Sequence, residues 1–207
     1  MILLLTGPPG AGKTTAMARL AERLRASGRK LAGFYTREVR ERGRRVGFDI
    51  ETLDGKTGVL ARTGLKGPAR VGSYGVDVEG FERLALDSLS GAPEVFIIDE
   101  IGKMEGFCLG FVRRARELLQ GEAPVAATVA EKGGGLIEEA KSSPGAELIE
   151  ISAQNRDALP AMLEAKVVEH LKREEERKMR RLRRIADVTQ ALLQQSGMSL
   201  QDCRLAV

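Results

Sequence analysis

Apolar and polar residues follow one another along the first 170 positions in blocks that predict strands followed by helices. Residues 2–5 are all apolar and precede a loop rich in glycine and proline, after which Lys13 to Ala26 has the period of an amphipathic helix. The same criteria predict further strands at residues 31–39, 94–99, 124–129 and 147–151, and further helices at residues 78–89, 107–120, 136–141 and 157–170.

This order of elements predicts an α/β fold with a doubly wound, mainly parallel sheet. Strands that alternate with helices of this length are joined by right-handed crossovers, which place parallel strands side by side. Aromatic residues make up only 4% of the chain and tryptophan is absent, so the core must consist mostly of aliphatic side chains. Such a core is typical of a parallel sheet that helices cover on both faces.

One segment departs from the alternation of strands and helices. Residues 44–61 alternate apolar and polar positions through Val46, Phe48 and Ile50 and contain a turn at Asp54-Gly55. This pattern predicts a β-hairpin inserted at the edge of the sheet or over a site. Residues 62–76 are rich in glycine without sustained periodicity, and we expect a mobile loop there that could act as a lid.

The loop after the first strand has the spacing G-x-x-x-x-G-K-[ST], which is typical of a phosphate-binding loop between a strand and a helix. Its residues are Gly7, Pro8, Pro9, Gly10, Ala11, Gly12, Lys13 and Thr14. Main-chain N–H groups and the helix N-terminus favour bound phosphates, Lys13 is expected at the β- and γ-phosphates, and the Thr14 hydroxyl at Mg²⁺. Thr15 is placed for the α-phosphate. The alternative is a glycine-rich turn that only begins a helix.

A second candidate site follows the apolar run Val95, Phe96, Ile97 and Ile98, which ends in two carboxylates, Asp99 and Glu100. The carboxyl ends of parallel strands face the ligand crevice, so we expect Asp99 to hold Mg²⁺ through water and Glu100 to activate an attacking water. A glutamate base beside the metal favours hydrolysis over transfer to a bulky acceptor. The alternative is a solvated strand end or a helix cap.

Three further groups are weaker candidates. Lys103 and Arg37 are predicted to stabilise negative charge on the γ-phosphate, although either could be an ordinary exposed side chain. Asn155 and Arg156 follow the last predicted strand, where a loop could contact the nucleotide base, while Asp157 beside them could simply cap a helix. The chain lacks an Asn-Lys-x-Asp guanine motif, so we expect weak base selectivity.

Several longer motifs resemble a known family. They are GFYTREVR at residues 33–40, RRVGFDIETLDG at 44–55, YGVD at 74–77, FERLAL at 81–86 and DEIGKME at 99–105. The chain is similar over about residues 1–168 to the nucleoside-triphosphatase family that includes the human cancer-related nucleoside triphosphatase and its thermophile relatives. The resemblance implies a RecA-like P-loop core, slow hydrolysis of several nucleoside triphosphates to diphosphate and phosphate, and nucleotide contacts at Gly7 to Thr14 and from Val95 through Ile101 and Gly102.

The charge distribution separates a C-terminal extension from this domain. The net charge of +4 lies entirely beyond residue 169, because residues 1–169 carry 24 charges of each sign. We therefore predict a triphosphatase domain at 1–169 and a charged helical extension at 170–207, with a short amphipathic face from Ile185 to Leu193. The extension could be a solvated helix, could pair with another subunit, or could be the one part that meets nucleic acid.

The remaining sequence features limit the protein's class. Cys108, Cys203 and His170 have no metal-ligand spacing, which favours a reduced, cytoplasmic setting. The apolar start is too short for a membrane span and lacks a basic leader, so we expect no membrane association. Besides Mg²⁺-dependent hydrolysis, the sequence leaves open a small-molecule or nucleotide kinase and an RNA-associated ATPase switch, and it leaves the oligomeric state undecided.

Overall fold

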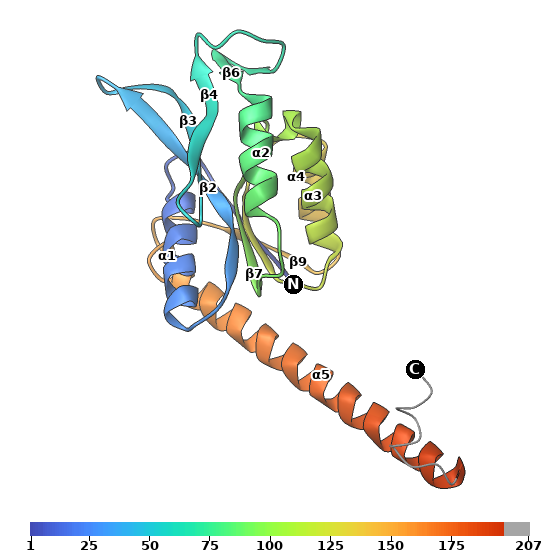
Figure 1. Ribbon diagram of the computed structural model, residues 1–207. Coiled ribbons are helices and arrows are strands. Elements are labelled where there is room, and N and C mark those ends of the chain that lie inside the picture. Colours follow the sequence, from blue (N-terminus) through green and yellow to red (C-terminus); the bar gives the residue numbers. More distant parts are fainter. Residues whose placement is uncertain (197–207) are drawn as a thin grey trace. The chain divides into compact units, whose positions relative to one another are not determined.

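The computed structural model describes residues 1–196, with side chains described up to residue 192 (Figure 1). Its strands are β1 (Ile2–Thr6), β2 (Leu31–Glu41), β3 (Arg44–Thr52), β4 (Thr57–Thr63), β5 (Arg70–Val71), β6 (Tyr74–Val76), β7 (Val95–Ile101), β8 (Val125–Val129) and β9 (Ala146–Glu150). Its helices are α1 (Lys13–Ala26), α2 (Val78–Ser88), α3 (Leu109–Gln120), α4 (Leu136–Ser142), α5 (Leu159–Ser196) and the 3₁₀ turn η1 (Glu105–Phe107). Cys203 lies outside the described residues.

The strands form one mixed sheet in the order β5-β6-β4-β3-β2-β7-β8-β1-β9. The half from β2 to β9 is parallel throughout, as the alternation of strands and helices predicted. The other half is antiparallel and extends the sheet from the edge of β2, so the predicted hairpin insertion is confirmed. Helix α1 covers one face of the sheet, and α2, α3 and α4 cover the other (Figure 1).

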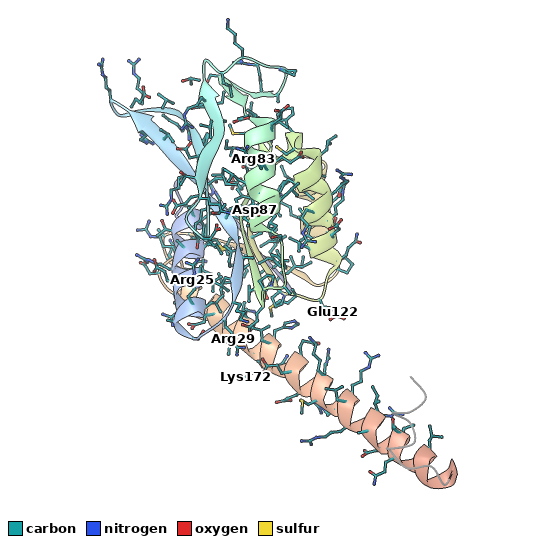
Figure 2. The ribbon with its side chains drawn as sticks, in the orientation of Figure 1. Arg25, Arg29, Arg83, Asp87, Glu122 and Lys172 are labelled. Atoms are coloured by element: carbon teal, nitrogen blue, oxygen red, sulfur yellow. The ribbon has the colours of Figure 1, made fainter. Side chains whose placement is uncertain are left out.

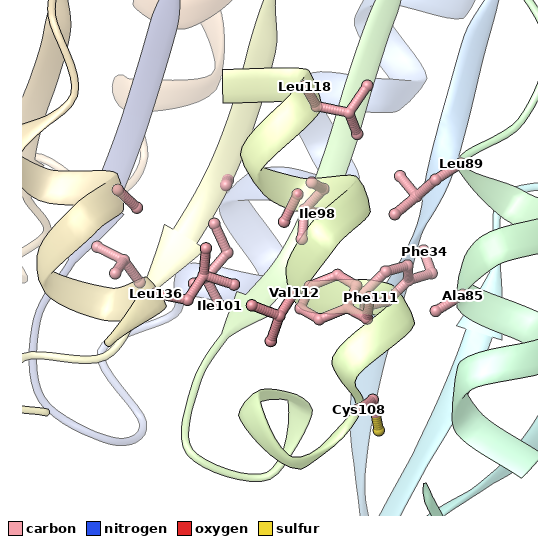
Figure 3. Packing of buried hydrophobic residues seen from close by; sticks show 14 of the residues in the cluster. Phe34, Ala85, Leu89, Ile98, Ile101, Cys108, Phe111, Val112, Leu118 and Leu136 are labelled. Atoms are coloured by element: carbon pink, nitrogen blue, oxygen red, sulfur yellow. The ribbon is translucent and has the colours of Figure 1, made fainter. Parts of the chain in front are cut away.

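The core is mainly aliphatic, with one aromatic cluster between the sheet and its helices. Phe34 of β2, Phe81 of α2 and Phe111 of α3 contact one another edge to face, with ring centroids 5.5–5.8 Å apart. Ile98 and Leu118 extend the same layer (Figure 3). Because all three phenylalanines are fully buried, they join helices α2 and α3 to the strand that carries the inserted hairpin.

Gly33 allows β2 to lie close to β7. Its φ is +130°, and a Cβ built there would lie 1.8 Å from the backbone oxygen of Ile97. No side chain fits in that space, and the backbone conformation itself favours glycine. The glycine of the GFYTREVR motif therefore has a packing role in the sheet, next to the strand that ends in Asp99.

The expectation of an irregular lid at residues 62–76 is wrong. Strand β4 continues to Thr63, and β5 and β6 pair with each other, while β6 also pairs with β4. The amide of Val76 donates to the carbonyl of Ala69, which closes this small hairpin. Strands of two and three residues carry too little periodicity to be detected in a glycine-rich sequence, since pairing partners rather than local propensity stabilise them.

The last helix of the domain and residues 170–196 of the predicted extension form a single helix, α5, of 38 residues. By internal contacts the chain divides into two units, Met1–Ala165 and Lys166–Val207. The second unit carries i,i+3 and i,i+4 ion pairs such as Arg173–Glu169 and Arg177–Glu174. Within residues 1–196, no helix combines the length and the apolar character that crossing a membrane requires.

Candidate functional site

The phosphate-loop sequence forms a tight turn between β1 and α1, and glycine is required at both of its ends. Gly7 has φ +145°, and a Cβ there would lie 2.9 Å from Ile151 Cγ2 and 3.0 Å from the Ile151 carbonyl. Gly12 has φ +101° immediately before the first residue of α1. These left-handed conformations let the intervening backbone curl around a ligand without a side chain in the way.

The start of α1 is prepared for an anion. The helix has no side-chain cap and no acidic residue in its first turn, so its N-terminal amides and its positive dipole end remain available. The Lys13 ammonium lies over the loop, where it donates to the carbonyls of Gly7 at 2.7 Å and Pro8 at 3.3 Å. Phosphate oxygens entering the loop would meet this ammonium and the free amides together.

Asp99 is a buried carboxylate beside this loop and is suited to a cation. Its side chain is 1% exposed and its Oδ1 accepts a hydrogen bond of 2.5 Å from the Thr128 hydroxyl. Within the described part of the chain, Asp99 Oδ2 has no hydrogen-bond partner. Burial raises the Asp99 pKa, while Thr128, Thr14 and the backbone of Thr36 lower it.

An unpartnered carboxylate oxygen facing a threonine hydroxyl matches the oxygen ligands that Mg²⁺ prefers. Thr14 and Asp99 would hold such an ion together with substrate phosphate oxygens and water. Across residues 1–196 no cluster of three or more histidine, cysteine or acidic residues is arranged to hold a metal by protein ligands alone. The donor set therefore fits an ion that arrives with a nucleotide.

Glu100 lies next to Asp99 on a strand that is longer than expected. Strand β7 runs to Ile101, and its register against β8 shifts between Ile98 and Ile101. A bulge of this kind interrupts the alternation of side chains and re-aims them, so two consecutive carboxylates can serve one site without strand fraying. Burial, followed by the charge of Asp99, raises the Glu100 pKa, and Lys13 lowers it.

A third carboxyl group in this region belongs to Glu105, the last residue of the DEIGKME motif, for which no role was predicted. It is 4% exposed, and burial, reinforced by Glu100 and Asp99, raises its pKa to about 8. A Cβ built at Gly102 would lie 2.7 Å from Glu105 Oε2 and 3.5 Å from Glu100 Oε1. Gly102 thus leaves the space in which both carboxyl groups sit.

A cavity of about 310 Å³ joins the phosphate loop to Glu100. Its lining consists of Pro9, Gly10, Gly12, Lys13, Thr14, Thr15, Thr36, Glu38, Arg45, Phe48 and Glu100. The predicted loop residues and Glu100 therefore meet in one place. Glu38 of β2 and Arg45 and Phe48 of β3 were not predicted to lie there. The Arg45 guanidinium contacts Glu38 at 3.1 Å and lies 5.5 Å over the Phe48 ring.

The two predicted catalytic cations lie outside the lining of this cavity. Arg37 alternates with Thr36 and Glu38 along β2, which directs its side chain to the other face, where it pairs with Glu51 of β3. Arg37 lies within β2, where the sequence predicted a strand at residues 31–39. Lys103 is exposed and lines neighbouring cavities beyond Glu100. Arg45 takes the place near the loop that was expected for Arg37.

The two candidates for base contact behave differently. The Asn155 side chain is engaged within its own loop, since its Oδ1 accepts from the Ser152 amide at 2.8 Å and its Nδ2 donates to the Glu150 carbonyl at 2.9 Å. Arg156 reaches the phosphate loop, where its Cδ would lie 3.9 Å from a Cβ at Gly12. Asp157 contacts Arg19 at 3.4 Å, and α5 begins only at Leu159, so Asp157 is not its cap.

The run from Val95 to Gly102 only partly reaches the nucleotide cavity. The side chains of Val95, Phe96, Ile97, Ile98 and Ile101 are buried in the core. Gly102 lines a second cavity of about 240 Å³ with Glu100, Thr36 and Phe48, which also line the first. Leu60, Val71, Lys103, Met104, Glu105 and Ala130 complete the second lining. Glu100 therefore stands between two adjoining cavities.

Comparison with known proteins shows a family and individual proteins to which this chain is similar. The model of a family described as NTPase matches residues 2–163. The nucleoside-triphosphatase THEP1 of Thermotoga petrophila is 42% identical over 162 residues, which cover 77% of this chain and 88% of that protein. The human cancer-related nucleoside-triphosphatase is 41% identical over 173 residues, which cover 76% of this chain and 91% of that protein.

Solved structures agree with the sequence comparison. The crystal structure of THEP1 from Aquifex aeolicus has a TM-score of 0.72 at 36% identity and covers 81% of this chain and 99% of its own. The solution structure of a human cancer-related nucleoside triphosphatase has a TM-score of 0.69 at 40% identity and covers 80% of this chain and 96% of its own. The α/β P-loop fold predicted from the sequence is confirmed, and the chain belongs to the NTPase family.

Proposed function

We propose that this protein hydrolyses Mg²⁺-bound nucleoside 5′-triphosphates to the diphosphate and phosphate, with little preference among ATP, GTP, CTP and UTP. The observation that carries this proposal is the single cavity that holds the phosphate loop, Lys13, Thr14 and Glu100. The names of the similar proteins, which are nucleoside-triphosphatases, support the same reaction class.

Binding follows from the loop geometry. The free amides at the start of α1 and the Lys13 ammonium would hold the β- and γ-phosphates, with Thr15 beside the α-phosphate. A magnesium ion held by Thr14 and Asp99 would neutralise phosphate charge. Asp99 stays fixed for this task because Thr128 donates to one of its oxygens and leaves the other free.

Glu100 would activate the nucleophile. Its carboxylate takes a proton from a water molecule as the water oxygen bonds to the γ-phosphorus, and the bond from that phosphorus to the bridging oxygen of the β-phosphate breaks. A base buried next to Asp99 has a raised pKa, which strengthens it as a proton acceptor. Arg45 is placed to meet charge that develops on the transferred group.

Weak base selectivity follows from where the polar side chains lie. The charged lining residues gather around the phosphate loop, and Arg156 is the side chain beside Gly12 that could reach a sugar or base. A guanidinium packs against any base through its planar face. Specific recognition would instead need hydrogen-bonding groups at the base edge.

The decisive experiment measures phosphate release from the four nucleotides with Mg²⁺ and without any acceptor, for the intact protein and for Glu100→Gln. Turnover of several nucleotides that the substitution reduces at least ~100-fold, with nucleotide binding retained, supports the proposal. Glu122→Gln, in the turn after α3 and away from the cavity, is the matched control (Figure 2). Tight nucleotide binding without phosphate release from the intact protein would refute hydrolysis.

One observation favours testing the kinase alternative as well. The second cavity, on the other side of Glu100, is far larger than the ~30 Å³ that one water molecule occupies in the liquid, and Phe48, Leu60 and Met104 give it an apolar lining. A transferase would place an acceptor hydroxyl there, with Glu100 as its base. Phosphate release without an acceptor separates the two reactions, since a strict kinase consumes nucleotide only when an acceptor is present.

A further inference from the structure

The extension carries an apolar face that the triphosphatase site does not use. In residues 177–192 of α5, here called the amphipathic segment, Met179, Leu182, Ile185, Val188 and Leu192 are 53–60% exposed. Leu182, Ile185 and Leu192 lie within one side of the helix, together with Thr189, because they recur at steps of three and four residues. This face lies outside the part of the chain that the NTPase family model matches.

The amphipathic segment is strongly basic. The segment contains six cations, Arg177, Lys178, Arg180, Arg181, Arg183 and Arg184, and one acid, Asp187. Arg177 and Arg180 pair with glutamates of the preceding turn, whereas the other four cations have no ion pair among residues 1–196. At 3.6 residues per turn, Arg180 and Arg183 lie opposite the side that carries Leu182, Ile185 and Leu192, whereas Lys178 and Arg181 lie on that side. Long charged side chains stand along α5, with Lys172 labelled (Figure 2).

An apolar face on a strongly basic helix matches an anionic lipid surface better than it matches other partners. At a bilayer surface the apolar face enters the boundary between headgroups and acyl chains while the cations meet anionic headgroups. Nucleic acid would engage the cations and leave the apolar side chains in water, and the segment has no aromatic residue for stacking on bases.

A second copy of the chain is the weaker match. Either a parallel or an antiparallel pairing of two amphipathic segments would bring twelve cations together with two acids. Paired helices of this kind usually place charges of both signs beside the apolar seam. The body of the protein, with 24 charges of each sign in residues 1–169, offers no general cationic surface, so the attraction to anions is concentrated in the extension.

We propose that residues 177–192 bind the surface of anionic lipid bilayers, with the helix parallel to the surface, Leu182, Ile185 and Leu192 in the interfacial region and the arginines at the headgroups. The helix lies on the membrane and does not span it. This proposal replaces the expectation of no membrane association, which rested on the lack of a membrane-spanning segment. The proposal does not depend on the reaction proposed above, because no residue of the amphipathic segment belongs to the nucleotide cavity.

The test is sedimentation of the full-length protein with vesicles of equal parts phosphatidylcholine and phosphatidylglycerol, compared with vesicles of phosphatidylcholine alone. Each cation near an anionic surface strengthens binding about fivefold, so Arg181→Gln with Arg184→Gln should weaken binding to the anionic vesicles about 25-fold. Leu182→Ser with Ile185→Ser should weaken it at least ~10-fold through lost apolar burial.

Matched controls make the same kinds of substitution within residues 1–169, outside the amphipathic segment. Arg83→Gln with Arg113→Gln removes two exposed arginines, and Leu109→Ser removes a leucine that is 72% exposed. These controls should leave vesicle binding within about twofold, since neither change touches the amphipathic segment.

Three results would overturn the proposal. The first is failure to bind anionic vesicles. The second is binding to poly(U) RNA, with no vesicle binding, that Leu182→Ser with Ile185→Ser leaves unchanged, which would assign the extension to nucleic acid. The third is a dimer in sedimentation velocity that those serine substitutions dissociate, with no vesicle binding, which would assign the apolar face to a second copy.

Discussion

The free energy of unfolding of the intact domain should fall as pH rises, and replacing Glu105 with glutamine should remove most of that fall. Glu105 is buried beside Gly102, and its pKa rises from 4.5 to about 8 on folding, mainly because burial disfavours the charged form. A carboxyl whose folded pKa lies above its unfolded pKa holds its proton more tightly when folded. Its contribution is therefore fully present below the unfolded pKa and is lost as pH rises through the folded pKa.

The size of this effect follows from the two pKa values. A difference between 4.5 and about 8 corresponds to about 5 kcal/mol when the titration is complete. Most of it falls between about pH 5 and pH 9, where the intact protein should lose about 4 kcal/mol relative to Glu105→Gln. Asp99 and Glu100 are present in both proteins, so the difference between them isolates Glu105.

The assay is urea unfolding at a series of pH values, without nucleotide or Mg²⁺, because a bound cation would change the charge around Glu105. The intact protein and Glu105→Gln should have stabilities that diverge steadily as pH rises, with the glutamine variant the more stable at alkaline pH. Glu122→Gln, which changes an exposed carboxyl in the same way, should follow the intact protein. Parallel curves for the intact protein and Glu105→Gln would refute the assignment of a buried, protonated carboxyl.

Two further predictions test the sheet and the hairpin. Gly33→Ala should destabilise the domain by at least about 3 kcal/mol in urea unfolding, because its Cβ would meet a backbone oxygen at 1.8 Å, whereas Gly43→Ala, with open space around it, should cost about 1 kcal/mol for its left-handed φ. Arg45→Ala should lower the kcat for phosphate release about 100-fold, because the guanidinium lines the nucleotide cavity, while Arg37→Ala should change it less than about twofold. Equal effects of the two arginine substitutions would contradict the assignment of strand faces.

The sequence predicted the parts of the site that a continuous stretch of chain encodes. The phosphate loop is a run of neighbouring residues whose glycines, lysine and threonine each have a local geometric role, so their spacing was sufficient. Asp99 and Glu100 end an apolar strand, and the rule that ligands bind at the carboxyl ends of parallel strands predicted a position for them near the loop, where Glu100 lines the same cavity.

The parts that failed depend on pairing between distant segments. Thr128 binds Asp99 across 29 positions of sequence, and nothing in the local pattern of β8 marks its hydroxyl. The arginine that reaches the cavity is Arg45 and not Arg37, because the register of β2 with β3 decides which face each side chain takes. A shift of one residue reverses that choice, and sequence patterns rarely fix strand register so finely.

The position of β1 in the sheet has a consequence for the order in which the protein is made. Among the strands that the structure describes, β1 pairs with β8 and β9, so its partners are residues 125–128 and 146–150. Although the phosphate loop leaves the ribosome before the rest of this domain, the strand that anchors it has no sheet partner until more than a hundred further residues have followed. Long-range pairing of this kind forms late, because loop closure must precede its stabilising contacts. Nascent chains that end before β8 should therefore not retain nucleotide, and the onset of nucleotide retention would mark the completion of the domain during synthesis.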